Sequence, residues 1–125
     1  GHLIAQFLLG ASYFQGQGVE QNDVAAEEWF RKAADQGYAP AQFGLGGLYY
    51  EGRGVKQSYV EAAKWFRKSA DQNEPTGQVA LGHCYEEGHG VRQDYKKAKE
   101  YYGLACDNGS NDGCENYARL NKQGY

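Results

Sequence analysis

The chain has 125 residues, of which 41% are hydrophobic and 23% charged, and its formal net charge is −3. This length and composition are typical of one globular domain. The mild charge and the lack of a basic stripe argue against nucleic-acid binding, and no apolar run is long enough to predict membrane insertion.

The first four residues, 1–4, are interpreted as a lead-in. Gly1 and His2 are typical of residues left behind by an expression tag. The chain then starts directly at the first helix of a repeat, where a preceding helix would normally cover it. We therefore expect it to be excised from a longer protein.

Three copies of one 36-residue pattern follow without a gap, at 5–40, 41–76 and 77–112. Ten of the 36 positions carry the same residue type in all three copies, such as Gly10, Gly46 and Gly82. Unrelated segments would share almost none of these identities. The sequence therefore predicts a tandem array of one supersecondary unit.

Each copy contains two apolar patterns of helical period around a glycine-rich joint. In copy one, Ala5, Leu9 and Tyr13 predict the first helix, which we call helix A, and Ala26 and Ala33 lie on the buried stripe of the second, helix B. Strand alternation is absent. The Gly-x-Gly of each joint lacks the preceding strand that a dinucleotide site requires, so we expect no cofactor.

Helix boundaries are marked in the same register in every copy. Good N-cap residues precede helix B, and Ser58 with Glu61 forms the pattern of a capping box. Gly or Asn, which favour the left-handed conformation, follow helix B. The N-caps are Asn22, Ser58 and Asp94, the residues after helix B are Gly37, Asn73 and Gly109, and Val19, Val55 and Val91 are expected to plug each joint into the core.

Residues 113–125 begin a fourth helix A with a changed pattern. Tyr117 occupies the leucine position and Asn121 replaces the core tyrosine, while Asn116, Arg119 and Lys122 are polar. A helix with one buried and one wet side is what terminates a solenoid. We predict a C-terminal capping helix.

The pattern resembles the Sel1-like repeat, a relative of the tetratricopeptide repeat with a longer inter-helix loop. The resemblance covers 5–112 fully and the tail in part. It implies an all-α, right-handed α/α superhelix. It also implies a concave face, lined by the A helices, that binds other proteins.

Copy three and the tail are also similar to the Helicobacter cysteine-rich proteins, whose repeats join two cysteines eight residues apart. Cys106 and Cys114 have that spacing, whereas the other copies carry Ala34 with Gln42 and Ala70 with Gln78. The resemblance implies one disulfide, and two reduced cysteines are the alternative. A bridge would indicate a periplasmic or secreted protein, without excluding the cytoplasm.

Other chemistry has weaker support. His83, Glu86, Glu87 and His89 fall on variable positions, which favours a solvated face over a metal site. The same cysteine-rich relatives imply β-lactam binding or hydrolysis as an alternative function. No Ser-x-x-Lys or His-Glu-x-x-His is present, so we expect no enzyme.

The positions that differ between copies fall on one side of helix A, opposite the conserved Leu-Tyr stripe. The resemblance to tetratricopeptide repeats implies that these positions line the concave face. This face would be aromatic in its N-terminal part and acidic in its C-terminal part. We predict a monomeric scaffold that binds a protein or peptide there, with a structural spacer as the alternative. The predicted contact residues are Phe7, Ala11, Phe14, Gln15, Phe43, Gly47, Tyr50, Glu51, Val79, His83, Glu86 and Glu87.

Overall fold

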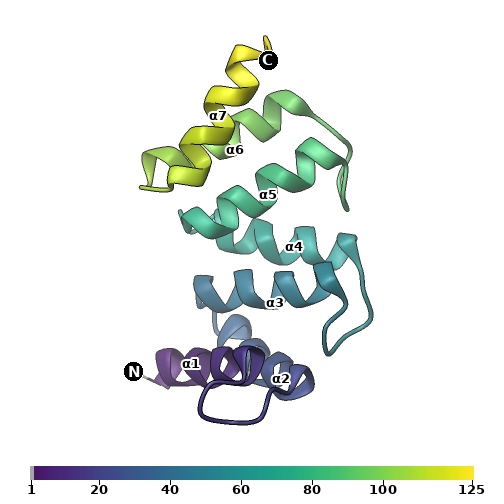
Figure 1. Ribbon diagram of the computed structural model, residues 1–125, viewed down its shortest axis with the longest axis vertical. Coiled ribbons are helices and arrows are strands. Elements are labelled where there is room, and N and C mark those ends of the chain that lie inside the picture. The colour runs from purple at the N-terminus through teal and green to yellow at the C-terminus, as the bar shows by residue number, and fades with distance from the viewer. Residues whose placement is uncertain (1) are drawn as a thin grey trace.

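Helices account for nearly all of the regular structure. The computed structural model describes residues 2–125, and Gly1 lies outside them. Within that range the chain forms helices α1 His2–Gln15, α2 Asp23–Asp35, α3 Ala39–Glu51, α4 Tyr59–Ala70, α5 Pro75–Glu87, α6 Tyr95–Asp107 and α7 Asn111–Lys122, with no strand. Each helix packs on the next, so that the pairs stack in one direction from α1 to α7 (Figure 1). The predicted all-α solenoid is confirmed.

The B helices α2, α4 and α6 begin as the sequence predicts. Asn22, Ser58 and Asp94 each have an extended backbone and accept a hydrogen bond from the amide three residues on. The capping box at Ser58 forms only in part. The Ser58 amide donates to the Tyr49 carbonyl oxygen at 2.9 Å, and the Glu61 carboxylate lies near Lys64 instead.

The ends of the B helices also follow the prediction, because Gly37, Asn73 and Gly109 have positive φ values of 90°, 62° and 96°. The joints between helices differ from one copy to the next. Val55 and Val91 pack against the core, whereas Val19 is 37% exposed. The prediction that the three valines plug the joints into the core is therefore confirmed for Val55 and Val91 and wrong for Val19.

Close approach between helices depends on the glycine of each A helix. A Cβ atom at Gly10, Gly46 or Gly82 would lie within 2.7 Å of a ring atom of Phe30, Phe66 or Tyr102, respectively. Each ring therefore lies directly against the backbone of its A helix. This confirms that the glycine allows the B helix to approach closely.

A line of side-chain hydrogen bonds crosses each repeat. Gln36 donates to Gln6 at 3.1 Å, and Gln72 donates to Gln42 at 2.8 Å. In the third repeat Asn108 donates to Gln78, which is 1% exposed, at 3.0 Å. The buried amides of Gln6, Gln42 and Gln78 are thus satisfied by partners 30 residues away, which ties the start of each A helix to the end of the B helix of the same repeat.

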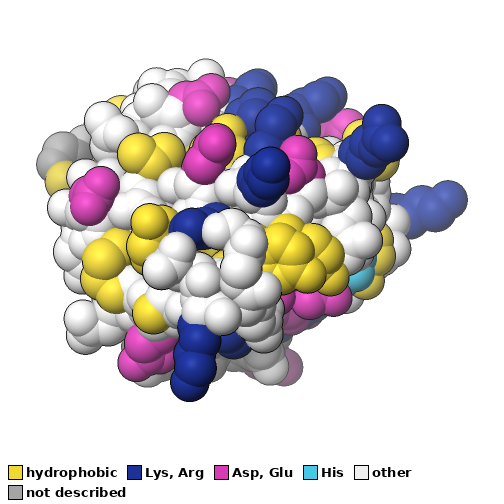
Figure 2. Space-filling view, turned by 90° about the horizontal axis from the view of Figure 1, so that it is seen from above, with side chains coloured by type: hydrophobic (Ala, Val, Ile, Leu, Met, Phe, Trp, Pro, Cys, Tyr) yellow, Lys and Arg dark blue, Asp and Glu magenta, His cyan; other side chains and the backbone are white. Residues whose placement is uncertain are grey.

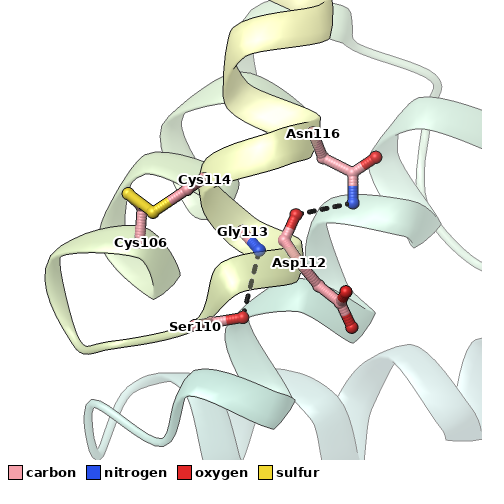
Figure 3. The surroundings of a disulfide bond; sticks show 6 residues. All are labelled: Cys106, Ser110, Asp112, Gly113, Cys114 and Asn116. Atoms are coloured by element: carbon pink, nitrogen blue, oxygen red, sulfur yellow. Dashed lines mark hydrogen bonds between the residues drawn. A yellow bond between two sulfur atoms is a disulfide. The ribbon is translucent and has the colours of Figure 1, made fainter.

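The C-terminal helix α7 packs on α6 and contacts α5. It begins at Asn111, two residues before the predicted start at 113, because Ser110 acts as its N-cap and accepts from the Gly113 amide (Figure 3). The predicted disulfide is present, joining Cys106 at the end of α6 to Cys114 in the first turn of α7 (Figure 3). Leu120 is fully buried and anchors the rest of the helix.

The outer surface at this end carries mixed charge. Viewed from the α7 end, Lys and Arg side chains gather toward one edge, and acidic and hydrophobic side chains lie among and beside them (Figure 2). In the described part of the chain, no helix combines the length and hydrophobicity needed to cross a bilayer.

Candidate partner-binding face

The A helices present a pocketed surface, which we call the A face and define by three pockets along α1, α3 and α5. The largest apolar one, the aromatic pocket, has a volume of about 300 Å³. Its predicted lining residues come from α1 and α3. They are Phe7, Ala11, Phe14, Gln15, Phe43, Gly47 and Glu51, joined by Phe30, Pro40 and Gly44, which the sequence analysis did not assign to the site.

The walls of the aromatic pocket are held by ring contacts. Phe7 packs 5.7 Å from Phe30 and 5.7 Å from Tyr38, centroid to centroid. Phe14 lies 6.5 Å from Phe30, and the Arg53 guanidinium covers its ring at 3.9 Å. Phe7 and Phe14 are half-buried and Phe30 is buried, so these rings support the fold and line the pocket at the same time.

The floor of the aromatic pocket is made of small residues. A Cβ atom added at Gly47 would meet no atom within 4 Å, so this glycine is not required by packing. Its neighbour Gly46 faces the opposite way, toward Phe66. The absence of a side chain at Gly47 leaves open space between α1 and α3.

Two further pockets lie on either side of His83. One, of about 260 Å³, is lined by Tyr50, Phe66, Ala80, His83 and Glu87. The other, of about 270 Å³, is lined by Phe43, Thr76, Val79, Ala80, His83, Ser110 and Asp112. Together the three pockets collect all of the predicted contact residues except Glu86.

Glu86 points into the protein rather than toward a partner. Its carboxylate accepts hydrogen bonds from Tyr102 at 2.8 Å and from Arg119 at 2.7 Å, and its side chain is only 13% exposed. Burial disfavours the charge, but these two bonds outweigh it and lower the pKa of Glu86. The acidic part of the face is therefore carried by Glu51 and Glu87, with Asp112 added by α7.

The residues missed by the sequence analysis had weak signals. Phe30 and Phe66 lie on the helix B stripe that was assigned to the core, yet their rings reach between the A helices. Gly44 and Ala80 share one position of the repeat and are both small, which was the available signal. Ser110 and Asp112 enter the face only because α7 folds back over α5.

The pocket beside α7 contains serine, histidine and aspartate, the residue types of a hydrolase triad. Here the Ser110 oxygen accepts the N-cap hydrogen bond, and the His83 Nδ1 atom bonds Tyr102 at 2.8 Å. No hydrogen bond joins Ser110 to His83 within residues 2–125. Ser110 and His83 therefore do not form the pair of nucleophile and base that a catalytic triad requires.

The remaining thiol lies away from these pockets. Cys84 is fully buried, and burial raises the pKa of its thiol to about 11, which keeps it protonated and unreactive. It is a packing residue of the hydrophobic core. No group of three or more His, Cys, Asp or Glu side chains in residues 2–125 is placed to hold a metal ion.

The helix hairpins stack on one another, and one helix of each pair contributes to a pocketed face. This arrangement defines an α-solenoid repeat protein. A family model for the Sel1 repeat matches residues 3–38, 39–74 and 75–110. The chain belongs to the Sel1 repeat family. Among curated proteins, none matches the chain.

Solved structures agree with this assignment. A protective antigen of uropathogenic Escherichia coli with an SLR fold is 40% identical, with a TM-score of 0.93 over 99% of this chain and 27% of its own. A Sel1 repeat protein from Oxalobacter formigenes is 40% identical, with a TM-score of 0.90 over 98% of this chain and 50% of its own. Cysteine rich protein B of Helicobacter pylori is 25% identical, with a TM-score of 0.77 over 91% of this chain and 88% of its own. The chain thus spans half or less of the length of the first two.

Proposed function

We propose that the chain is a non-catalytic, monomeric scaffold that binds a peptide segment of another protein along the A face. The observation that carries this proposal is the aromatic pocket. It has half-buried rings for walls and open space above Gly47 for a floor. An apolar side chain of a partner would bury most of its surface there, which is worth about 1.5–3 kcal/mol for a residue such as leucine.

The acidic residues around the pockets favour a partner with a basic residue next to the apolar residue that fills the aromatic pocket. Glu51 at the rim is 57% exposed, and its nearest cation is Arg53 at 3.9 Å, a weak contact. Glu87 on α5 is exposed. A segment with an apolar residue followed by Lys or Arg would match both features.

The test fills the pocket without disturbing the fold. A displayed random peptide library is selected on the immobilised protein, and one enriched peptide is titrated against purified variants. Gly47→Leu places a side chain in the open space, and we expect at least about a tenfold loss of affinity. Equal binding by Gly47→Leu would contradict the proposal, and failure to enrich any peptide would favour a structural spacer.

Two further variants complete the test, and the second of them is the control. Phe14→Ala with Tyr50→Ala removes aromatic wall area on two repeats and should also weaken binding. Val60→Leu adds apolar surface on α4, at a residue 63% exposed that lines none of the three pockets, and should leave affinity unchanged.

We also propose that the protein is exported to the periplasm or beyond the cell. The Cys106–Cys114 bridge supports this because disulfides persist in oxidising compartments. The description of one similar structure as a protective antigen points the same way. A thiol count on protein purified from its native host under denaturing conditions tests it. One free thiol, that of Cys84, is expected, and three would contradict export.

A further inference from the structure

Two histidines in this chain make the same contact with a tyrosine. The Nδ1 atom of His83 lies 2.8 Å from the Tyr102 hydroxyl, and the Nδ1 atom of His89 lies 2.6 Å from the Tyr50 hydroxyl. A hydroxyl can donate its one proton or accept. Which ring nitrogen of each histidine carries the hydrogen therefore depends on where the tyrosine proton goes.

The proton of Tyr102 is committed elsewhere. Its hydroxyl lies 2.8 Å from the Glu86 carboxylate, which Arg119 holds in the ionised form. An ionised carboxylate only accepts, so Tyr102 must donate to Glu86. The phenol oxygen then accepts from His83, and the hydrogen of the neutral imidazole lies on Nδ1.

The Tyr50 hydroxyl, in contrast, does not donate its proton to a carboxylate in the described part of the chain. Within residues 2–125 its hydroxyl makes no hydrogen bond other than the one to His89. It is free to donate to Nδ1 of His89, which leaves that imidazole with its hydrogen on Nε2. The two histidines should therefore carry their hydrogens on opposite nitrogens.

We propose that His83 presents an unprotonated Nε2 to the A face and accepts a hydrogen bond there from a Lys or Arg side chain of the bound segment. The imidazole is exposed and lines both pockets on its flanks. Glu87 lines one of these pockets and Asp112 the other, while the charge of Arg119 is taken up by Glu86. Charge complementarity therefore selects a cationic donor. This inference rests on the proposed function and names the chemistry of its partner.

Binding should then weaken on acidification. Protonated His83 has no free acceptor and adds a positive charge beside the cation of the partner. The other charged or titratable groups facing His83 are Tyr102, Glu86, Arg119, Glu87, Asp112 and Tyr50.

The first measurement needs no ligand. Long-range ¹H–¹⁵N correlation of the side chains at a pH where both imidazoles are neutral distinguishes the two tautomers. We expect His83 with its hydrogen on Nδ1 and His89 with its hydrogen on Nε2. Tyr102→Phe should move His83 to the Nε2 form and leave His89 unchanged. Finding His83 in the Nε2 form in the unaltered protein would overturn the inference.

The second measurement uses the displayed random peptide library described above. Enriched peptides should carry Lys or Arg, and His83→Ala should weaken the best of them about tenfold, since hydrogen bonds to charged groups are strong. Val60→Leu, at the exposed residue outside the three pockets that was used above, is the control. Peptides that lose affinity with Gly47→Leu but not with His83→Ala would overturn this inference alone. Failure to enrich any peptide would overturn the proposed function with it.

Discussion

The side chain of Gln78 donates from Nε2 to the carbonyl oxygen of Ala70, eight residues earlier, at 3.4 Å. Gln42 makes the same bond to Ala34 at 3.3 Å, also eight residues earlier. In the last repeat the equivalent positions are Cys114 and Cys106, again eight residues apart, and a disulfide takes the place of the hydrogen bond. Within residues 2–125, the contact between a B helix and the following helix is thus covalent between α6 and α7 and a hydrogen bond between α2 and α3 and between α4 and α5.

Removing the disulfide should loosen α7. Cys106→Ala with Cys114→Ala is expected to lower the free energy of unfolding by about 2.5 kcal/mol, because a closed loop of about nine residues no longer restricts the unfolded chain. Urea denaturation followed by circular dichroism measures this. As a matched variant, Cys106→Ala with Cys114→Gln restores the residue pair of the other repeats and should recover part of the loss. Equal stability of all three proteins would contradict the role given to the bridge.

Adjacent glycines in α3 should respond in opposite directions to the same substitution. Gly47→Ala adds a Cβ atom in open space and gains helix propensity, so we expect a stabilisation of about 0.5–1 kcal/mol. Gly46→Ala places a Cβ atom 2.7 Å from the Phe66 ring, and forcing these groups apart should destabilise by about 1–3 kcal/mol. Thermal or urea unfolding of the two variants settles the sign of each.

The loop glycines allow backbone strain to be separated from contact. Gly18 and Gly90 have the same φ of 75°, but a Cβ atom at Gly18 meets nothing within 4 Å, whereas one at Gly90 would lie 2.1 Å from the Tyr59 carbonyl oxygen. Gly18→Ala should cost about 1–2 kcal/mol for the left-handed conformation alone. Gly90→Ala should cost more, and the difference measures the contact between a loop and the preceding B helix. Equal destabilisation by the two substitutions would show that the loop moves away from Tyr59 and relieves the contact.

The Glu86 carboxylate should make stability depend on pH in the acid range. Its pKa is lower in the folded protein than its ordinary value of 4.5, so its contribution is present above that value and is lost as the pH falls through the folded pKa. Glu86→Gln should therefore destabilise the protein at neutral pH and have a smaller effect at about pH 3. Glu87→Gln, at an exposed carboxylate, is the control. A constant difference across pH would contradict the pairing with Arg119 and Tyr102.

Local signals in the sequence were sufficient for the helices and their ends. Asn22, Ser58 and Asp94 cap as predicted because an N-cap depends on residues only three positions apart. The positions that differ between the three copies also located the A face, because they fall on one side of helix A. The capping box failed in part because the Ser58 amide found a tertiary partner at Tyr49, which no local pattern describes.

Long-range pairing was what the sequence did not predict. Glu86 was placed among the exposed acidic residues, but Arg119, 33 residues later on α7, draws its carboxylate inward. Gln6, Gln42 and Gln78 are identical in all copies, yet their partners lie 30 residues away and depend on how the two helices of a repeat pack. Spacing within one helix cannot specify either contact.

The amide line from Gln36 to Gln6, from Gln72 to Gln42 and from Asn108 to Gln78 links residues at one constant separation. The contact between the two helices of a repeat is therefore the same in each of these three copies, whatever the position of the copy in the chain. Duplicating or deleting one whole 36-residue unit would leave the amide pairs of the remaining units intact, whereas inserting a single residue between the members of one pair would shift that pair out of register. Recombination between copies can therefore change the length of the solenoid by whole repeats without altering the contacts inside each repeat.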